Sequence, residues 1–260
     1  MKKRTFSAIL LLIFLITCLC ISSKLFGIAM TIVSILGFNE FFDIKYNKSK
    51  EHRIIKIFGF ICLCLLLLNN IFYHVDIKAL ILLPILTLSL PIVFYNDNKV
   101  YNINDCLYVL GIVYFLGLSF GNIINLRDVN VAKCIFIFII AFITDTYAYI
   151  GGNLVGRHKL TEISPKKTIE GSLIGMFMGV SIGTVYYFNV IGEITVFQTV
   201  MLCFFLTILS EIGDLVFSSI KRYFGKKDYS NLIPGHGGVL DRFDSVIYVS
   251  LGLSLILSLV

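Results

Sequence analysis

The sequence predicts an all-α polytopic membrane protein of about nine transmembrane helices, with a cytoplasm-facing polar site in its C-terminal half. Three observations carry this prediction. The 260 residues are 57% hydrophobic and only 15% charged, whereas a soluble domain carries about 25% charged residues. Apolar runs of about 20 residues recur along the chain, and each is long enough to cross a bilayer as a helix. The basic residues gather in alternate loops, which is typical of membrane proteins with a fixed orientation.

The predicted spans lie near residues 5–22, 24–42, 54–75, 77–96, 105–125, 131–152, 171–190, 195–219 and 244–260. The first could instead be a signal peptide, because Lys2, Lys3 and Arg4 precede an apolar run and Cys18 lies in a loose lipobox. A tight connection to the next span and the lack of an A-x-A-like cleavage site favour a membrane span. Residues 1–130 then form an N-terminal region of about five spans, and residues 131–260 a catalytic region of about four.

The distribution of basic residues predicts the orientation of the chain. In a nine-span topology, all Lys and Arg residues except Lys24, Lys78, Arg127 and Lys133 lie on one side of the membrane. The positive-inside rule makes that side cytoplasmic, and we expect the protein in the cell (inner) membrane. The net charge of +6 does not indicate nucleic-acid binding, because the basic residues lie in short loops. Topology and attraction to anionic lipid head groups explain most of them.

The seven cysteines do not predict a metal site. Two of the possible pairs, Cys18/Cys20 and Cys62/Cys64, lie two residues apart, and such positions on a helix point about 200° away from each other. We interpret the cysteines as small hydrophobic residues buried in the spans.

Polar residues concentrate in the C-terminal half, where ionisable side chains inside a span usually face a cavity or a partner. The first such stretch, residues 141–156, contains Asp145. On a helix Asp145, Tyr149, Gly152 and Gly156 share one stripe. This stripe is either one wall of a polar site or a contact at which small residues let two helices approach closely.

The second polar stretch is a loop that begins at Arg157 and ends near Gly171. It holds hydroxyl groups, two lysines and a carboxylate: Ser164, Lys166, Lys167, Thr168 and Glu170. Cationic and neutral hydrogen-bond donors beside a helix start are suited to a polyphosphate. The alternative is an ordinary capped helix, in which Thr168 is the cap and both lysines only set the topology.

The third stretch, residues 211–244, gives the strongest signal. On a helix, one face would carry Glu211, Asp214, Ser218, Lys221 and Arg222. Carboxylates in a membrane followed by cations at its edge are costly for stability, and they fit a metal–nucleotide site. A glycine-rich loop follows, with His236 and two glycines that would let backbone N–H groups approach an oxyanion. Asp241 and Asp244 come next, as metal or substrate ligands or as an N-capping box.

These residues closely resemble the signature of the phosphatidate cytidylyltransferase (CDP-diacylglycerol synthase) family. The matching positions are Ser218, Lys221, Arg222, Lys227, Asp228, Pro234, His236, Gly237, Gly238, Asp241, Arg242 and Asp244. A second block of the family matches at Asp145, Ser164, Pro165, Lys167, Thr168, Glu170 and Gly171. Ile169 departs from the pattern, because the family commonly has Trp at that position. The first five spans match the family only in their hydrophobicity.

The resemblance implies a reaction in which CTP and phosphatidate give CDP-diacylglycerol and pyrophosphate, with Mg²⁺ required. It implies that Asp214 and Asp241 are the metal ligands, and it suggests a homodimer. We assign catalysis to Asp214, Asp241, Lys221, Arg222, Lys227, Asp228, His236, Arg242 and Asp244. We assign substrate binding to Asp145, Ser164, Lys166, Lys167, Thr168, Glu170, Ser218, Gly237 and Gly238.

Two other classes of protein remain open from the sequence. One is another CTP-using membrane enzyme, such as a CDP-archaeol synthase or a polyprenol or phytol kinase. The other is a transporter, which should show interrupted spans in both halves around a site at the midplane. The polar residues of this chain instead lie in one half and near one membrane face, which favours the enzyme.

Overall fold

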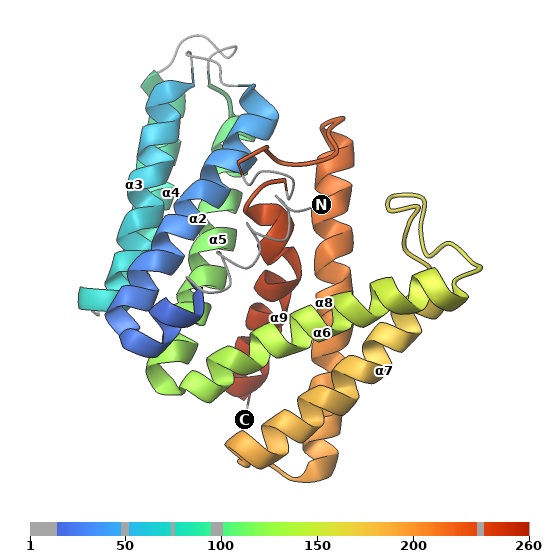
Figure 1. Ribbon diagram of the computed structural model, residues 1–260. Helices are drawn as coiled ribbons and strands as arrows, with labels where there is room; N and C mark the ends of the chain where they lie inside the picture. Colours follow the sequence, from blue (N-terminus) through green and yellow to red (C-terminus); the bar gives the residue numbers. More distant parts are fainter. Residues whose placement is uncertain (1–14, 48–51, 74–75, 95–100, 233–236, 260) are drawn as a thin grey trace. The chain divides into compact units, whose positions relative to one another are not determined.

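The computed structural model describes residues 15–47, 52–73, 76–94, 101–232 and 237–259, and this part of the chain is almost entirely helical (Figure 1). The helices are α2 (Ser23–Tyr46), α3 (Arg53–Leu68), α4 (Ile77–Phe94), α5 (Ile103–Val129), α6 (Val131–Val155), α7 (Ile169–Tyr186), α8 (Val196–Tyr223) and α9 (Leu240–Leu259). Two π-helical turns, η1 (Asn69–Tyr73) and η2 (Tyr187–Ile191), follow α3 and α7. The described residues form no β-strand, and an isolated bridge joins Lys159 to Thr168.

Seven of these helices are long and apolar enough to span a membrane, namely α2, α3 with η1, α5, α6, α7 with η2, α8 and α9. Helix α4 is a shorter apolar helix in which Pro84 and Pro91 interrupt the backbone hydrogen bonds. The prediction of an all-helical polytopic membrane protein is therefore confirmed. The first predicted span, residues 5–22, lies largely outside the described residues.

Local capping explains where several helices begin. The Asn130 side chain accepts a hydrogen bond from the Ala132 N–H at the start of α6. Thr195 and Gln198 form a reciprocal capping box at the start of α8. Each cap provides a hydrogen-bond acceptor for a backbone N–H group that has no partner inside the helix. Leaving such a group without a partner would destabilise the helix.

The chain divides into two compact units. Unit 1 comprises residues Met1–Asn125 and Asp228–Leu240, and unit 2 comprises Leu126–Lys227 and Asp241–Val260. The segment that follows α8 thus leaves unit 2 and returns to it at Asp241. The middle part of the C-terminal motif, from Asp228 to Leu240, therefore belongs to unit 1, while its first and last parts belong to unit 2.

Unit 1 packs through small residues and aromatic side chains of its helices. A methyl group placed on Gly59 of α3 would lie 2.7 Å from the Phe38 ring of α2, so glycine is needed for the two helices to approach. The Tyr108 hydroxyl of α5 donates a hydrogen bond to the Phe41 carbonyl of α2, at 2.7 Å. Where two helices meet inside a bilayer, close packing of this kind replaces the hydrophobic effect as the stabilising force.

Unit 1 also contains an ion pair in which every carboxylate oxygen has a partner. The Lys45 Nζ lies 2.8 Å from Asp105 Oδ1, and the Tyr46 hydroxyl donates to the same oxygen at 2.8 Å. The second oxygen of Asp105 accepts from the Asn102 backbone N–H at 3.2 Å. We call Lys45, Tyr46, Asn102 and Asp105 the balanced cluster.

Unit 2 is built around a line of glycines on α7, Gly171, Gly175, Gly179 and Gly183, which we call the glycine seam. All four are buried. A methyl group on Gly175 would lie 2.6 Å from the Thr144 carbonyl oxygen of α6, and one on Gly179 would lie 2.7 Å from the Thr207 methyl group of α8. The seam therefore brings the backbone of α7 against both neighbouring helices, and α6 and α7 run side by side in Figure 1.

Candidate active site

The predicted polar stripe of α8 faces the interior of unit 2 over most of its length. Glu211, Ser218 and Lys221 are buried and Asp214 is half-buried. Arg222, the last member, is exposed, and its guanidinium donates to the Lys226 carbonyl oxygen at 3.0 Å. The helical period thus places four of the five residues together on the interior side.

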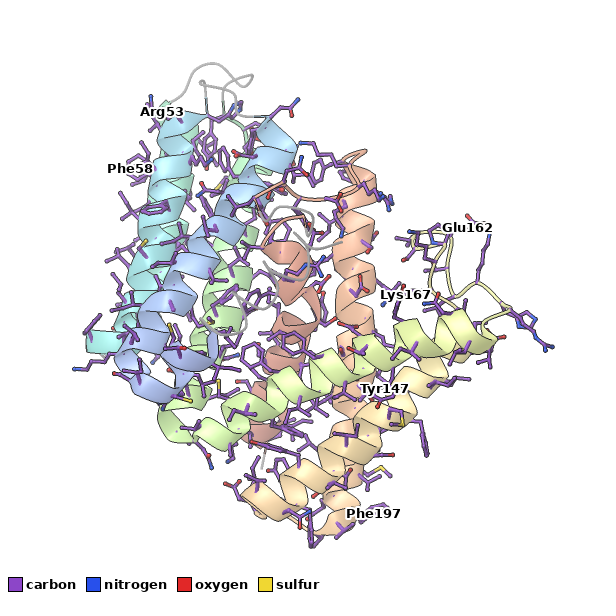
Figure 2. All side chains as sticks on the ribbon, viewed as in Figure 1. Arg53, Phe58, Tyr147, Glu162, Lys167 and Phe197 are labelled. Carbon is purple, nitrogen blue, oxygen red and sulfur yellow. The ribbon has the colours of Figure 1, made fainter. Side chains whose placement is uncertain are left out.

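Lys167 reaches from the loop before α7 to the stripe. Its Nζ lies 2.6 Å from Asp214 Oδ2, and the Ser218 hydroxyl donates to Asp214 Oδ1 at 3.2 Å. Figure 2 shows Lys167 on the side of its loop that faces α8, whereas Glu162 lies at the outer part of the same loop. Burial alone would lower the pKa of Lys167, but the Asp214 carboxylate outweighs it and the pKa is raised. Lys167 is therefore a fixed positive charge at neutral pH.

Four carboxyl groups from three helices lie near this ion pair, and three of them act on Lys167 itself. Asp145 of α6, Glu211 and Asp214 of α8 and Asp244 of α9 lie within electrostatic range of one another, and we call them the acidic cluster. The Ser172 hydroxyl donates to Glu211 Oε2. Glu211 Oε1 is buried and has no hydrogen-bond partner in the described part of the chain. The acidic cluster thus contains more carboxyl groups than Lys167 can pair with directly.

A second lysine–aspartate pair joins α8 to α9. Lys221 Nζ lies 2.6 Å from Asp241 Oδ1, and the two side chains are only 11% and 5% exposed. The two helices approach closely at Gly213, where a methyl group would lie 2.8 Å from the Asp244 carbonyl oxygen. Two of the four lysines assigned to the site, Lys167 and Lys221, are therefore held by the two aspartates assigned to the metal.

The stripe predicted on α6 divides between two roles. Asp145 belongs to the acidic cluster. Gly152 and Gly156 lie against the start of α7, since a methyl group on either would lie within 3.0 Å of Thr168 Oγ1. Tyr149 is 73% exposed and does not continue the polar wall. The glycines of the stripe thus make the close helix contact that was the alternative interpretation.

The loop before α7 is held largely by its own residues. Thr168 caps α7 by accepting from the Gly171 N–H at 3.1 Å, as the alternative interpretation expected. Glu170 Oε1 lies 2.6 Å from His158 Nδ1, and its Oε2 accepts from the backbone N–H groups of Arg157 and His158. Lys166 is exposed, unlike Lys167. Substrate contacts of Ser164, Lys166, Thr168 and Glu170 stay predictions.

The glycine-rich motif lies in unit 1, and its anchor was missed by sequence reasoning. Glu40, buried in α2, accepts hydrogen bonds from the backbone N–H groups of Val239 at 2.8 Å and Leu240 at 2.9 Å. A methyl group on Gly238 would lie 2.6 Å from Glu40 Oε1. Gly238 therefore makes room for a carboxylate of the protein itself. A lone Glu inside an otherwise apolar predicted span was the signal in the sequence.

The remaining predicted residues are spread over the two units. Gly237 has a positive φ of 84°, which favours glycine. Lys227, Asp228 and Arg242 are exposed. His236 and Pro234 lie outside the described residues. Helix α9 begins at Leu240, four residues before the predicted span, so Asp241 and Asp244 both lie in its first turns.

The donor atoms of unit 2 fit an open Mg²⁺ site. Mg²⁺ is usually held by one or two carboxylates, with water and substrate phosphates completing its coordination. Among the described residues, no three His, Cys, Asp or Glu side chains form a closed metal cage. The half-buried Asp214 and the unpartnered oxygen of Glu211 nevertheless offer hard oxygen ligands. Joint binding of one ion by Asp214 and Asp241 stays a prediction.

Comparisons with known proteins agree with these features over the whole chain. The sequence profile described as the cytidylyltransferase family matches residues 2–260. Proteins named phosphatidate cytidylyltransferase from Staphylococcus haemolyticus (strain JCSC1435) and Staphylococcus aureus (strain COL) are each 30% identical to the chain, over 254 and 257 residues. Each alignment covers 96% of this chain and 96% of the relative. The resemblance found in the C-terminal motifs is thus confirmed, and the chain belongs to the cytidylyltransferase family.

Proposed function

We propose that the protein is a phosphatidate cytidylyltransferase of phospholipid biosynthesis, which converts CTP and phosphatidate to CDP-diacylglycerol and pyrophosphate. The observation that carries this proposal is identity of 30% over 96% of the chain to relatives of that name. The chemistry of unit 2 supports it, because two lysines are held by two aspartates beside a surplus of carboxylates.

In this reaction a phosphate oxygen of phosphatidate attacks the α-phosphorus of CTP, and pyrophosphate leaves. The attacking phosphate is already largely ionised at neutral pH, so no general base is needed. Catalysis is then mainly positioning and neutralisation of charge. Lys167 and Lys221 are suited to this task, since each ammonium is oriented by an aspartate and can donate to a phosphate oxygen without searching many rotamers.

Other cations of the motif would bind the phosphates that these lysines do not reach. We assign this role to the exposed Arg222, Lys227 and Arg242, with Ser164 and Ser218 as hydroxyl donors. The Mg²⁺ that we expect to be required would be held by Asp214 and Asp241, and it would neutralise charge on the phosphates in transfer. Asp145, Glu211 and Asp244 surround Asp214 and would keep the region attractive to cations.

We extend the proposal to the arrangement in the membrane. The chain crosses the cell (inner) membrane nine times, with residues 131–260 as the catalytic region and its site on the cytoplasmic side. The supply of CTP on that side and the distribution of Lys and Arg residues support this orientation. A homodimer is part of the proposal through the family resemblance alone.

One assay tests the reaction. Purified protein in detergent micelles is incubated with labelled CTP, phosphatidate and Mg²⁺, and we expect a lipid-soluble cytidine product with one pyrophosphate released per turnover. Chelation of Mg²⁺ should stop the reaction, and its return should restore it. Release of CDP with phosphorylation of a lipid alcohol would assign the protein to the kinases instead. Activity in micelles, where no compartments exist, eliminates transport as the sole function.

Single-cysteine labelling tests the orientation. Cysteines are introduced at positions 166 and 227 of a cysteine-free variant, and intact cells are treated with a membrane-impermeant maleimide. Neither position should react until the cells are opened. Labelling of position 227 in intact cells would overturn the proposed orientation.

A further inference from the structure

A buried carboxylate of unit 1 holds both ends of the segment that carries the glycine-rich motif. Glu40 Oε1 accepts from the Ser230 hydroxyl at 2.6 Å and from the Val239 N–H at 2.8 Å. Its other oxygen accepts from the Leu240 N–H at 2.9 Å. Two points of the chain nine residues apart, Ser230 and Val239, thus meet on one oxygen atom.

Further contacts of α2 lie beside the same two points of the chain. The Phe41 ring packs edge-on against the Tyr229 ring, with centroids 5.2 Å apart, beside Ser230. A methyl group on Gly37 would lie 2.9 Å from the Leu240 side chain, so α2 also approaches the far end of the segment. Apolar contacts of α2 with Tyr229 and Leu240 therefore lie beside the polar contacts of Glu40 with Ser230 and Leu240.

The cost of this residue argues that it serves more than local packing. Glu40 is only 5% exposed, and burying a carboxylate in a membrane helix is expensive. The backbone N–H groups that it binds lie at the start of α9, where a helix has unpaired donors and favours negative charge. A neutral residue would pack in α2 more cheaply, but it would leave those N–H groups without their carboxylate.

We propose that Glu40 is a positioning residue for the cytidylyltransferase reaction, which acts through the start of α9. By binding the N–H groups of Val239 and Leu240, it sets where the helix begins, and the next residue of the chain is Asp241. This inference rests on the proposed function for its catalytic part. Its structural part concerns the protein alone and can be tested without substrate.

The structural part is tested by amide hydrogen exchange of the substrate-free protein. Glu40→Gln keeps the side-chain shape but offers one acceptor oxygen in place of two. We expect peptides that contain Val239 and Leu240 to exchange at least about tenfold faster, in line with the loss of a charge-assisted hydrogen bond. The matched control is Asp43→Asn, since Asp43 lies on the same helix and pairs with Lys56 of α3, whose Nζ is 2.8 Å from Asp43 Oδ1. Unchanged exchange in Glu40→Gln, or an equal change in the control, would show that Glu40 does not hold the start of α9.

The catalytic part is tested by combining variants. If Glu40 acts through Asp241, Glu40→Gln should lower the rate of the wild type but lower the residual rate of Asp241→Asn little further. Asp43→Asn should act only on general stability. It should therefore lower the rates of the wild type and of Asp241→Asn by the same factor. If the rate of the double variant falls by the full product of the two single losses, Glu40 does not act through Asp241. Absence of cytidylyltransferase activity in the wild type would reject the proposed function and leave the exchange result standing.

Discussion

The two units each bury charged groups, and they treat them in opposite ways. In the balanced cluster of unit 1, Asp105 has a lysine, a tyrosine hydroxyl and a backbone N–H on its two oxygens. In unit 2, three carboxylates of the acidic cluster share Lys167, and one oxygen of Glu211 has no hydrogen-bond partner in the described part of the chain. Both clusters lie in helices that are apolar enough to span a membrane.

The difference teaches how to separate structural from functional charge in a membrane protein. A satisfied pair has little left to offer a ligand, and breaking it mainly costs stability. A cluster with more carboxyl groups than cationic partners is costly to ionise by itself, and binding of a cation stabilises its ionised form. The acidic cluster is therefore where we expect function, and the balanced cluster is where we expect only folding. Substitutions at five positions test this contrast, from the largest expected effect to the smallest.

The largest effect is expected at the predicted metal ligands. Asp214→Asn or Asp241→Asn should lower the rate at least about a hundredfold while the protein remains folded and inserted, because one strong electrostatic contact in a catalytic site is lost. The measurement is the rate of CDP-diacylglycerol formation at saturating CTP. If both residues hold one Mg²⁺, the double variant should be no slower than the slower single variant. A full product of the two losses would assign the aspartates to separate roles.

A smaller loss is expected at the lysine of the acidic cluster. Lys167→Ala removes the charge that lies 2.6 Å from Asp214, and we expect turnover to fall at least about tenfold or the KM for CTP to rise by a similar factor. Steady-state kinetics over a range of CTP concentrations distinguishes these outcomes. Normal kinetics in this variant would remove Lys167 from the site.

The balanced cluster should respond in stability and not in chemistry. Asp105→Asn leaves Lys45 without its carboxylate, which costs at most about 3 kcal/mol of unfolding free energy because Lys45 is partly exposed. A lower thermal midpoint in detergent, with a rate per folded molecule within about twofold of the wild type, is the expected result. A large loss of rate at unchanged stability would erase the distinction between the two clusters.

The smallest effect is expected at the neighbouring lysine. Lys166 is exposed on the same loop as Lys167, so Lys166→Ala should change turnover by less than about twofold. The same kinetic assay measures it beside Lys167→Ala. Equal losses in the two variants would mean that the loop contributes its total charge and not one placed ammonium.

Much of the fold follows from the sequence because lipid is a demanding solvent. Inside a bilayer no water is available to the backbone, so a spanning segment must pair its own N–H and C=O groups in a helix. Hydropathy alone therefore located the regions of α2 to α9. The polar face of α8 was also predictable, because a helix repeats every 3.6 residues and Glu211, Asp214, Ser218 and Lys221 follow that period. In both cases the controlling interactions lie within one helix, so a local pattern is sufficient.

Other features depend on contacts between distant parts of the chain, and no local pattern contains them. Glu40 meets Val239 and Leu240 across 199 and 200 positions of sequence, and this contact accompanies the early start of α9. Glu170 pairs with His158, which lies twelve positions earlier in the chain and outside α7. The glycines of the seam recur every fourth residue in the sequence, but this repeat does not indicate which helices they contact.

The glycine seam also divides α7 into two faces with different freedom to change during evolution. Leu173, Phe177 and Val185 are 60%, 70% and 63% exposed in positions that lipid can reach, and one apolar side chain can replace another there without disturbing a neighbour. At Gly171, Gly175 and Gly179 the space for a side chain is already filled by α6 and α8. Among relatives, we expect the residues on the lipid-facing side of α7 to vary and the glycines at every fourth position of the other side to stay unchanged. The packing of α7 thereby sets which substitutions natural selection can accept.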